Sequence, residues 1–135
     1  EFVREVDGVA YYNDSKATNT TAAMTALRSF TEGVTWIAGG LNRGLSFDEM
    51  IPAVRRHVRR VIAYGETREL IVAMCRQAGI AECFTVENVE EAVRLARRLT
   101  PAGEVVLLSP ACASWDMYRS FEERGNIFKQ AVHKL

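Results

Sequence analysis

The sequence has little of what marks disulfide-rich, metal-binding or membrane-spanning proteins. It holds two histidines and three cysteines (Cys75, Cys83 and Cys112), an odd number without C-x-x-C spacing. Such cysteines are typical of reduced thiols in a cytoplasmic protein and not of a disulfide framework or a zinc site. No apolar run approaches the roughly 18 residues that a membrane-spanning helix needs. The chain begins at Glu1 and not at a methionine, so we expect a fragment of a longer, multidomain protein.

An excess of charge of either sign is also missing. Lys plus Arg and Asp plus Glu number 17 each, which gives a net charge of zero. This balance argues against a general nucleic-acid or membrane-surface binder, and we expect neither partner. The basic run RRHVRR, at residues 55–60, is more typical of the solvated face and end of a helix than of a nucleic-acid site.

What the sequence does contain is a regular alternation of strand-like and helix-like segments. EFVREVDGVAYYN, at residues 1–13, predicts a hairpin that turns at Asp7-Gly8. Short apolar runs predict further strands at residues 34–38, 61–64, 83–86 and 104–108. Helical spacing predicts helices at about residues 18–30, 47–58, 67–78, 88–99 and 119–135. The alternation predicts a single Rossmann-like α/β domain over residues 1–135, in which a mostly parallel sheet carries helices on both faces and an N-terminal β-hairpin.

Two of these helices carry details that a structure can test. Residues 46–49 fit a capping box for the second helix, and Pro52 means that this helix either kinks or begins near Ile51. In the first helix the apolar side chains are expected to face the core, namely those of Ala22, Met24, Ala26 and Leu27.

Polar motifs follow three of the predicted strands: NDSKAT at residues 13–18, GGLNRG at 39–44 and SPACASWD at 109–116. In an open parallel sheet these motifs gather at the carboxyl edge, where such folds bind ligands. Lys16 near a helix start indicates a bound anion, because a cation alone opposes the positive end of a helix. The carboxylate of Asp14 is an acceptor suited to ribose hydroxyls. The guanidinium of Arg43 is placed to form paired hydrogen bonds with a carboxylate or phosphate.

Plainer interpretations of the same motifs remain open. Ser15, Lys16 and Thr18 are also what a simple helix cap contains, and GGLNRG is also a flexible turn. The glycines match neither the Walker loop nor G-x-G-x-x-G. Cys112 and Ser114 lack the context of a nucleophile, since no G-x-S-x-G surrounds them and both histidines lie in helical stretches. Small residues there favour a backbone loop that closes around an anion.

NDSKATN, GGLNRG and LSPACASWDMYRSFEERGNIF resemble, in this order, the C-terminal domain of the Mur ligase family, and within it the members that add D-glutamate. The resemblance covers essentially the whole chain. Its specific parts are NDSKATN and SPACASxD, since sister ligases typically carry a signature with histidine in place of Ser15-Lys16-Ala17. The resemblance implies a monomeric, cytoplasmic bacterial ligase of peptidoglycan synthesis. In such a ligase ATP turns the terminal carboxylate of UDP-N-acetylmuramoyl-L-alanine into an acyl phosphate, which the amine of D-glutamate attacks.

The resemblance also implies roles for single residues on the nucleotide side. It places Asp14 on the ribose of ATP. It places Lys16 near the transferring phosphate and the incoming amino acid, where the ammonium group would stabilise developing negative charge.

On the amino-acid side, the resemblance places Thr18 and Arg43 on the α-carboxylate of D-glutamate. It places Ser114 and the backbone of Phe121 on the side-chain carboxylate. Many family members have lysine where this chain has Arg43, and the planar guanidinium fork is not equivalent to an ammonium group. The charge is kept, so we expect the role to survive with altered geometry.

The P-loop, the Mg²⁺ ligands and the UDP-sugar site of the family belong to N-terminal and central domains outside these residues. We therefore expect the chain to fold but not to catalyse alone. Three rival hypotheses are a stand-alone nucleotide-binding domain, a Mur-type ligase with another acceptor, and an interaction module that uses residues 55–60 as its contact surface.

Overall fold

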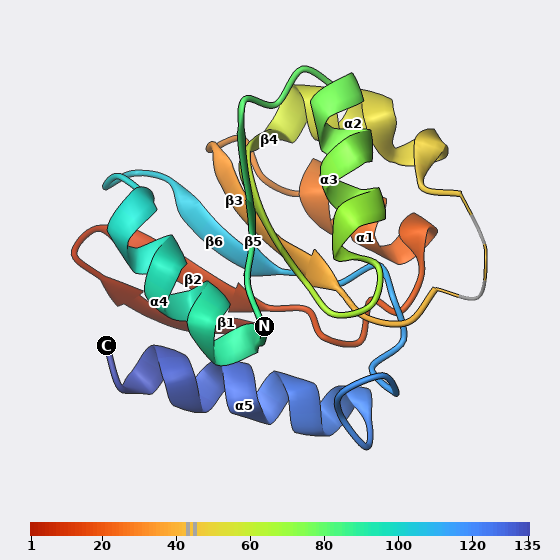
Figure 1. The fold of residues 1–135 in the computed structure, drawn as a ribbon. Coiled ribbons are helices and arrows are strands. Elements are labelled where there is room, and N and C mark those ends of the chain that lie inside the picture. Colours follow the sequence, from red (N-terminus) through yellow and green to blue (C-terminus); the bar gives the residue numbers. More distant parts are fainter. Residues whose placement is uncertain (43, 45) are drawn as a thin grey trace.

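Six strands form one sheet in the computed structural model, which describes residues 1–42, 44 and 46–135 (Figure 1). The order across the sheet is β1-β2-β6-β3-β4-β5. The first two strands pair antiparallel and every other neighbouring pair is parallel. The strands are β1 (Phe2–Val6), β2 (Val9–Asn13), β3 (Val34–Gly39), β4 (Val58–Tyr64), β5 (Glu82–Thr85) and β6 (Val105–Leu108). The predicted fold class, including the hairpin that turns at Asp7-Gly8, is confirmed.

Helices cover both faces of this sheet. The helical elements are α1 (Thr20–Arg28), the 3₁₀ turn η1 (Asp48–Met50), α2 (Ile51–His57), α3 (Arg68–Gln77), α4 (Val89–Leu99) and α5 (Phe121–His133). Leu27, Val54 and Ile71, from α1, α2 and α3, share one buried cluster with β3 and β4. Val93 of α4 and Phe128 of α5 belong to a second cluster on the opposite face (Figure 1). Each face is therefore covered by helices, as a strand such as β3, which is buried along its whole length, requires.

The last strand in the chain lies between the second and the third. β6 pairs with β2 through Ala10–Val105 and with β3 through Val34–Val105, both in parallel register. The insertion of β6 therefore places β2, β6 and β3, which are far apart in the sequence, next to one another in the sheet. The three polar motifs that follow β2, β6 and β3 therefore emerge side by side at the carboxyl edge of the sheet, as expected.

The predicted helix at residues 47–58 is confirmed over Ile51–His57, and it ends one residue earlier than predicted. Val58 begins β4, so its apolar side chain continues the sheet and not the helix. Arg60, expected on a solvated helix end, is 6% exposed. Its Nη1 donates to Glu104 Oε1 at 2.7 Å and to Thr35 Oγ1 at 2.8 Å, which compensates the buried charge. The solvated interpretation holds for Arg55 and Arg56, which are exposed.

The first half of that segment also differs from the capping-box prediction. Ser46 Oγ accepts from the backbone N–H of Asp48 at 3.1 Å, and the carboxylate of Glu49 pairs with the hydroxyl of Thr20 and not with the chain ahead of it. The segment opens as η1, and α2 begins at Ile51 with Pro52 in its first turn, the second of the two predicted alternatives.

The first helix faces the core through Leu27, as predicted, and Met24 and Ala26 pack against the same cluster. Ala23 and Leu27 are buried, whereas Ala22, Met24 and Ala26 are half-buried. Asn19 caps the helix through its side-chain oxygen, which accepts from the N–H of Ala22 at 2.8 Å.

Candidate functional site

Backbone hydrogen bonds join the three motif loops at the carboxyl edge. The N–H of Asp14 donates to Leu108 O at 2.7 Å, and the N–H of Ala111 donates to Ala17 O at 3.0 Å. Leu41 and Ala113 exchange both their N–H···O bonds, at 2.9 and 3.1 Å. The loops after β2, β6 and β3 thus form one connected surface, and a shift in one loop displaces the others.

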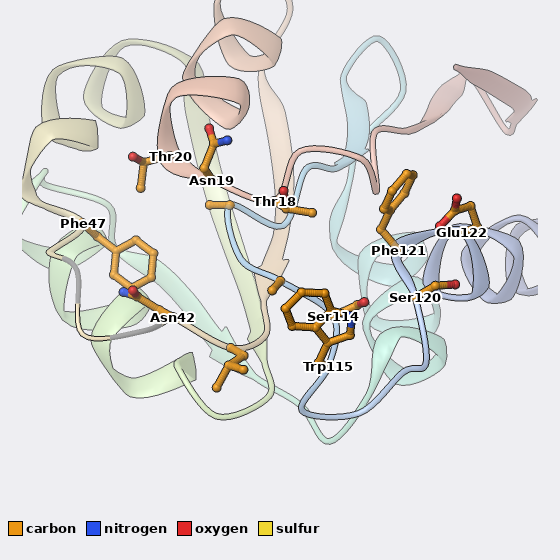
Figure 2. Close-up of a pocket in the computed structure, with 13 residues that line it drawn as sticks. Thr18, Asn19, Thr20, Asn42, Phe47, Ser114, Trp115, Ser120, Phe121 and Glu122 are labelled. Carbon is orange, nitrogen blue, oxygen red and sulfur yellow. The ribbon is translucent and has the colours of Figure 1, made fainter.

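A cavity of ≈ 550 Å³ opens on one side of this surface. Thr18, Ser114 and Phe121, which the sequence assigned to one amino acid, all line it (Figure 2). In Figure 2, Thr18 lies across the cavity from Ser114, with Phe121 to one side. Three residues predicted to bind one ligand therefore share one cavity.

Two helices begin at this cavity. Asn19 and Ser120, the N-cap residues of α1 and α5, both line it. Ser120 Oγ accepts from the N–H of Glu123 at 3.1 Å. The N-terminus of a helix presents free N–H groups and a positive dipole end. Two such ends beside one cavity suit an anion with more than one carboxylate.

Asp14 and Lys16 line a different cavity, of ≈ 730 Å³, on the other side of the same loop. The chain passes between the two cavities, since Ala17 lines this one and Thr18 lines the first. Tyr12 and Phe30 form an aromatic contact in its wall, with ring centroids 4.9 Å apart. The nucleotide side and the amino-acid side of the predicted site are therefore adjacent but separate hollows.

The carboxylate of Asp14 is held in a fixed direction. Ser109, which is fully buried after β6, donates its hydroxyl to Asp14 Oδ2 at 2.9 Å. Sequence reasoning missed this partner, because nothing in the spacing of residues 14 and 109 signals that their strands are neighbours. An acceptor fixed in this way is suited to a diol, since its orientation is set before the ligand arrives.

Lys16 is exposed and forms no hydrogen bond or ion pair with residues 1–42, 44 and 46–135. Its ammonium group therefore stays available for a ligand. Arg43, predicted to bind a carboxylate, lies outside the described residues, although its neighbour Asn42 lines the cavity of Thr18 and Ser114.

Phe47 and Trp115 also line that cavity and were not assigned to it from the sequence. The helical spacing placed Phe47 on a helix face, and nothing in the sequence indicated that its ring would line a cavity. Trp115 is 60% exposed, which is high for an indole, and it lies beside Ser114 (Figure 2). Together the two rings make much of the cavity wall apolar.

The structure agrees with the view that Cys112 is no nucleophile. Burial raises the pKa of Cys112 to about 11, and its sulfur lies 3.5 Å from the Thr67 hydroxyl, within hydrogen-bond distance. The thiolate, which is the nucleophilic form, is therefore scarce at neutral pH. His57 and His133 lie at the ends of α2 and α5.

We expect the cysteines to differ sharply in alkylation. Burial raises the pKa of Cys75 to about 12 and that of Cys112 to about 11, whereas Cys83 is only half-buried. Iodoacetamide at about pH 8 should modify Cys83 first and leave the other two intact while the chain is folded. Mass spectrometry of the peptides measures this order. Modification of Cys112 as fast as Cys83 under native conditions would contradict it.

In the part of the chain that the structure describes, no group of His, Cys, Asp and Glu side chains is arranged to hold a metal ion. Nor does any described helix have the length and apolarity that crossing a bilayer requires.

The model of the family called Mur ligase, glutamate ligase domain, matches residues 1–112. The chain belongs to the Mur ligase family. Members of this family are ATP-dependent amide-bond ligases.

Curated relatives match over the whole chain. The UDP-N-acetylmuramoylalanine–D-glutamate ligase of Lactobacillus acidophilus is 47% identical over 135 residues, which are 100% of this chain and 29% of that protein. The ligases of the same name from Bacillus cytotoxicus and Geobacillus kaustophilus are 49% and 50% identical, again over 100% of this chain and 30% of theirs. The chain thus spans less than a third of the length of these relatives.

Solved structures support the fold. A murein peptide ligase of Psychrobacter arcticus superposes with a TM-score of 0.63 at 14% identity, over 100% of this chain and 30% of that one. A crystallised domain of Haemophilus ducreyi, described as part of a UDP-N-acetylmuramate:L-alanyl-γ-D-glutamyl-diaminopimelate ligase, gives a TM-score of 0.62 at 14% identity, over 98% of both chains. The α/β arrangement is therefore that of a Mur ligase domain.

Proposed function

We propose that this chain is the C-terminal domain of a ligase that adds D-glutamate to UDP-N-acetylmuramoyl-L-alanine. One observation carries the proposal: the loop at residues 13–18 runs between two cavities. Lys16, which has no partner among the described residues, lies on one side, and Thr18, Ser114 and Phe121 lie on the other. Relatives of 46–50% identity that bear this enzyme's name support it. The full reaction requires the N-terminal and central domains.

On the nucleotide side, Asp14 would accept hydrogen bonds from the ribose hydroxyls of ATP. Its fixed Oδ2, held by Ser109 at 2.9 Å, supports this role. Lys16, which no described carboxylate neutralises, would lie near the transferring phosphate. ATP supplies the phosphoryl group that activates the acceptor carboxylate, and we propose that the accompanying Mg²⁺ is bound mainly by the central domain.

On the amino-acid side, Thr18 and Arg43 would bind the α-carboxylate of D-glutamate. Ser114 and the backbone of Phe121 would bind the side-chain carboxylate, beside the start of α5. Holding the amine against the activated carboxylate is then the contribution of this domain, and orientation alone lowers the barrier of such a reaction by several kcal/mol.

Phosphate release by the full-length parent protein tests the proposal. The assay contains ATP, Mg²⁺ and UDP-N-acetylmuramoyl-L-alanine, with D-glutamate, L-glutamate or meso-diaminopimelate as the acceptor. Release with D-glutamate alone is the expected result. Release with another acceptor would keep the ligase and overturn the specificity, and no release with any acceptor would favour a stand-alone nucleotide-binding domain. The isolated chain should release no phosphate, and turnover by it would contradict the need for the other domains.

A charge-reversed variant tests the rival interaction module. Arg56 and Arg59 are exposed at the end of α2 and the start of β4, at the opposite edge of the sheet from both cavities. The double change Arg56→Glu/Arg59→Glu should leave D-glutamate-dependent phosphate release within about twofold of the unchanged ligase. Arg60 is unsuitable for this test because it is buried. Loss of function in cells with unchanged ligase activity would favour the interaction module.

A further inference from the structure

Arg124 of α5 is fully buried, yet its guanidinium forms no salt bridge with a carboxylate of the described residues. A buried cation normally has a charged partner, because leaving water is costly. Arg60 of the same chain follows that rule through Glu104. Arg124 therefore needs an explanation other than ion pairing.

Three hydrogen bonds of the Arg124 guanidinium go to the two loops that carry the candidate site. Nε donates to Ser15 Oγ at 2.8 Å and Nη2 donates to Ser15 O at 2.7 Å. Nη1 donates to Cys112 O at 3.0 Å. Ser15 is itself 3% exposed, and its hydroxyl donates onward to Phe121 O at 2.7 Å. One guanidinium thus ties together the loop after β2, the loop after β6 and the first turn of α5.

Each anchor of this network is adjacent to a group with a proposed role. Ser15 directly precedes Lys16, Cys112 lies two residues before Ser114, and Phe121 is a proposed ligand through its own backbone. We propose that Ser15 and Arg124 act as positioning residues, which hold the nucleotide side and the amino-acid side of the site at a fixed separation. The inference rests on the proposed function, since it concerns the relative placement of the two ligands.

The close approach of α5 to the loop supports this role. A side-chain carbon at Gly125 would lie 2.9 Å from Asn13 Nδ2 and 3.2 Å from Ser15 Cβ, so any larger residue there would have to displace Asn13 or the Ser15 loop. The helix is thus drawn against the Ser15 loop at the level of Arg124. If the contact served stability alone, an apolar side chain of similar volume would fill the space without the cost of burying a cation.

Kinetics of the full-length parent ligase separate positioning from stability. A variant that is only less stable loses active enzyme, so kcat falls while the KM values stay the same. A variant with displaced loops binds both ligands poorly, so the KM values for D-glutamate and for ATP rise together. Ser15→Ala should raise both by about tenfold or more, because small displacements of positioned groups are costly.

Changes at Arg124 test the other half of the network. Arg124→Lys keeps the charge and should retain more activity than Arg124→Met, because it still reaches part of the network. In the double variant Ser15→Ala/Arg124→Lys the rise in KM should be smaller than the product of the two single effects, since both changes remove the same Nε–Oγ hydrogen bond. Arg97→Met is the matched control, because Arg97 is a surface arginine paired with Asp7 at 3.0 Å. It should leave both KM values unchanged.

Several outcomes would overturn the inference. Unchanged KM values in Ser15→Ala would show that the hydroxyl positions neither ligand, and this variant decides the matter even where Arg124→Met fails to fold. Fully multiplicative effects of the two single changes would also contradict it. D-glutamate-dependent release by the unchanged ligase tests the proposed function separately, and its absence would overturn both.

Discussion

Lys16→Ala in the full-length parent ligase is expected to lower kcat for D-glutamate-dependent phosphate release by about 100-fold or more. Lys16 is exposed and has no partner among the described residues, so its removal leaves no neighbour unsatisfied and should leave the fold intact. The loss would instead come from the reaction, where negative charge develops between the phosphate and the attacking amine. Initial rates at saturating ATP and D-glutamate, with circular dichroism of the same samples, measure both expectations.

Two further variants make this test specific. Lys134→Ala removes an exposed lysine that follows α5, far from both site cavities, and should keep the rate of the unchanged ligase. Lys16→Arg keeps the charge with a different shape and should recover part of the activity. A fall in kcat of less than tenfold in Lys16→Ala would show that Lys16 contributes to substrate binding and not to the chemical step.

Much of the fold could be predicted because local signals agree with the tertiary structure. Asp7-Gly8 turns the hairpin, and Asn88 caps α4 by accepting from the N–H of Glu91 at 2.8 Å, as the residue types predict. Where the pattern was ambiguous, the prediction was wrong. Val58 continues an apolar spacing of helical period, yet its β-branched side chain belongs to β4, whose pairing with β3 decides the conformation.

The order of the strands could not be predicted from periodicity, because a pattern reveals the type of an element and not its neighbours. The position of β6 between β2 and β3 is what brings Ser109 to Asp14 and Cys112 to Arg124. Arginine on a helix also indicates a solvated face in most sequences, so nothing marked Arg124 as buried. The motifs therefore predicted which loops form the site, and the structure was needed to find what holds those loops together.

Gly40→Ala is expected to lower the stability of the chain strongly and to disturb the amino-acid side of the site. Gly40 follows β3 with φ +132°, and a side-chain carbon there would lie 2.3 Å from Ala113 O and 3.0 Å from Cys112 Cβ. Backbone strain and the clash together should lower the free energy of unfolding by about 3 kcal/mol or more. Relief of the clash requires the 39–44 and 109–116 loops to separate, which would displace Ser114 and raise the KM for D-glutamate in the parent ligase.

A matched glycine separates the clash from the backbone conformation. Gly103 also has a positive φ, +92°, but no heavy atom lies within 4 Å of the position that its side-chain carbon would take. Gly103→Ala should therefore cost only about 1 kcal/mol and leave the KM for D-glutamate unchanged. Urea unfolding of this chain, followed by tryptophan fluorescence, gives the two free energies. Equal losses of unfolding free energy in the two variants would show that the two loops separate without cost. The paired hydrogen bonds between Leu41 and Ala113 would then not be what fixes the shape of the amino-acid cavity.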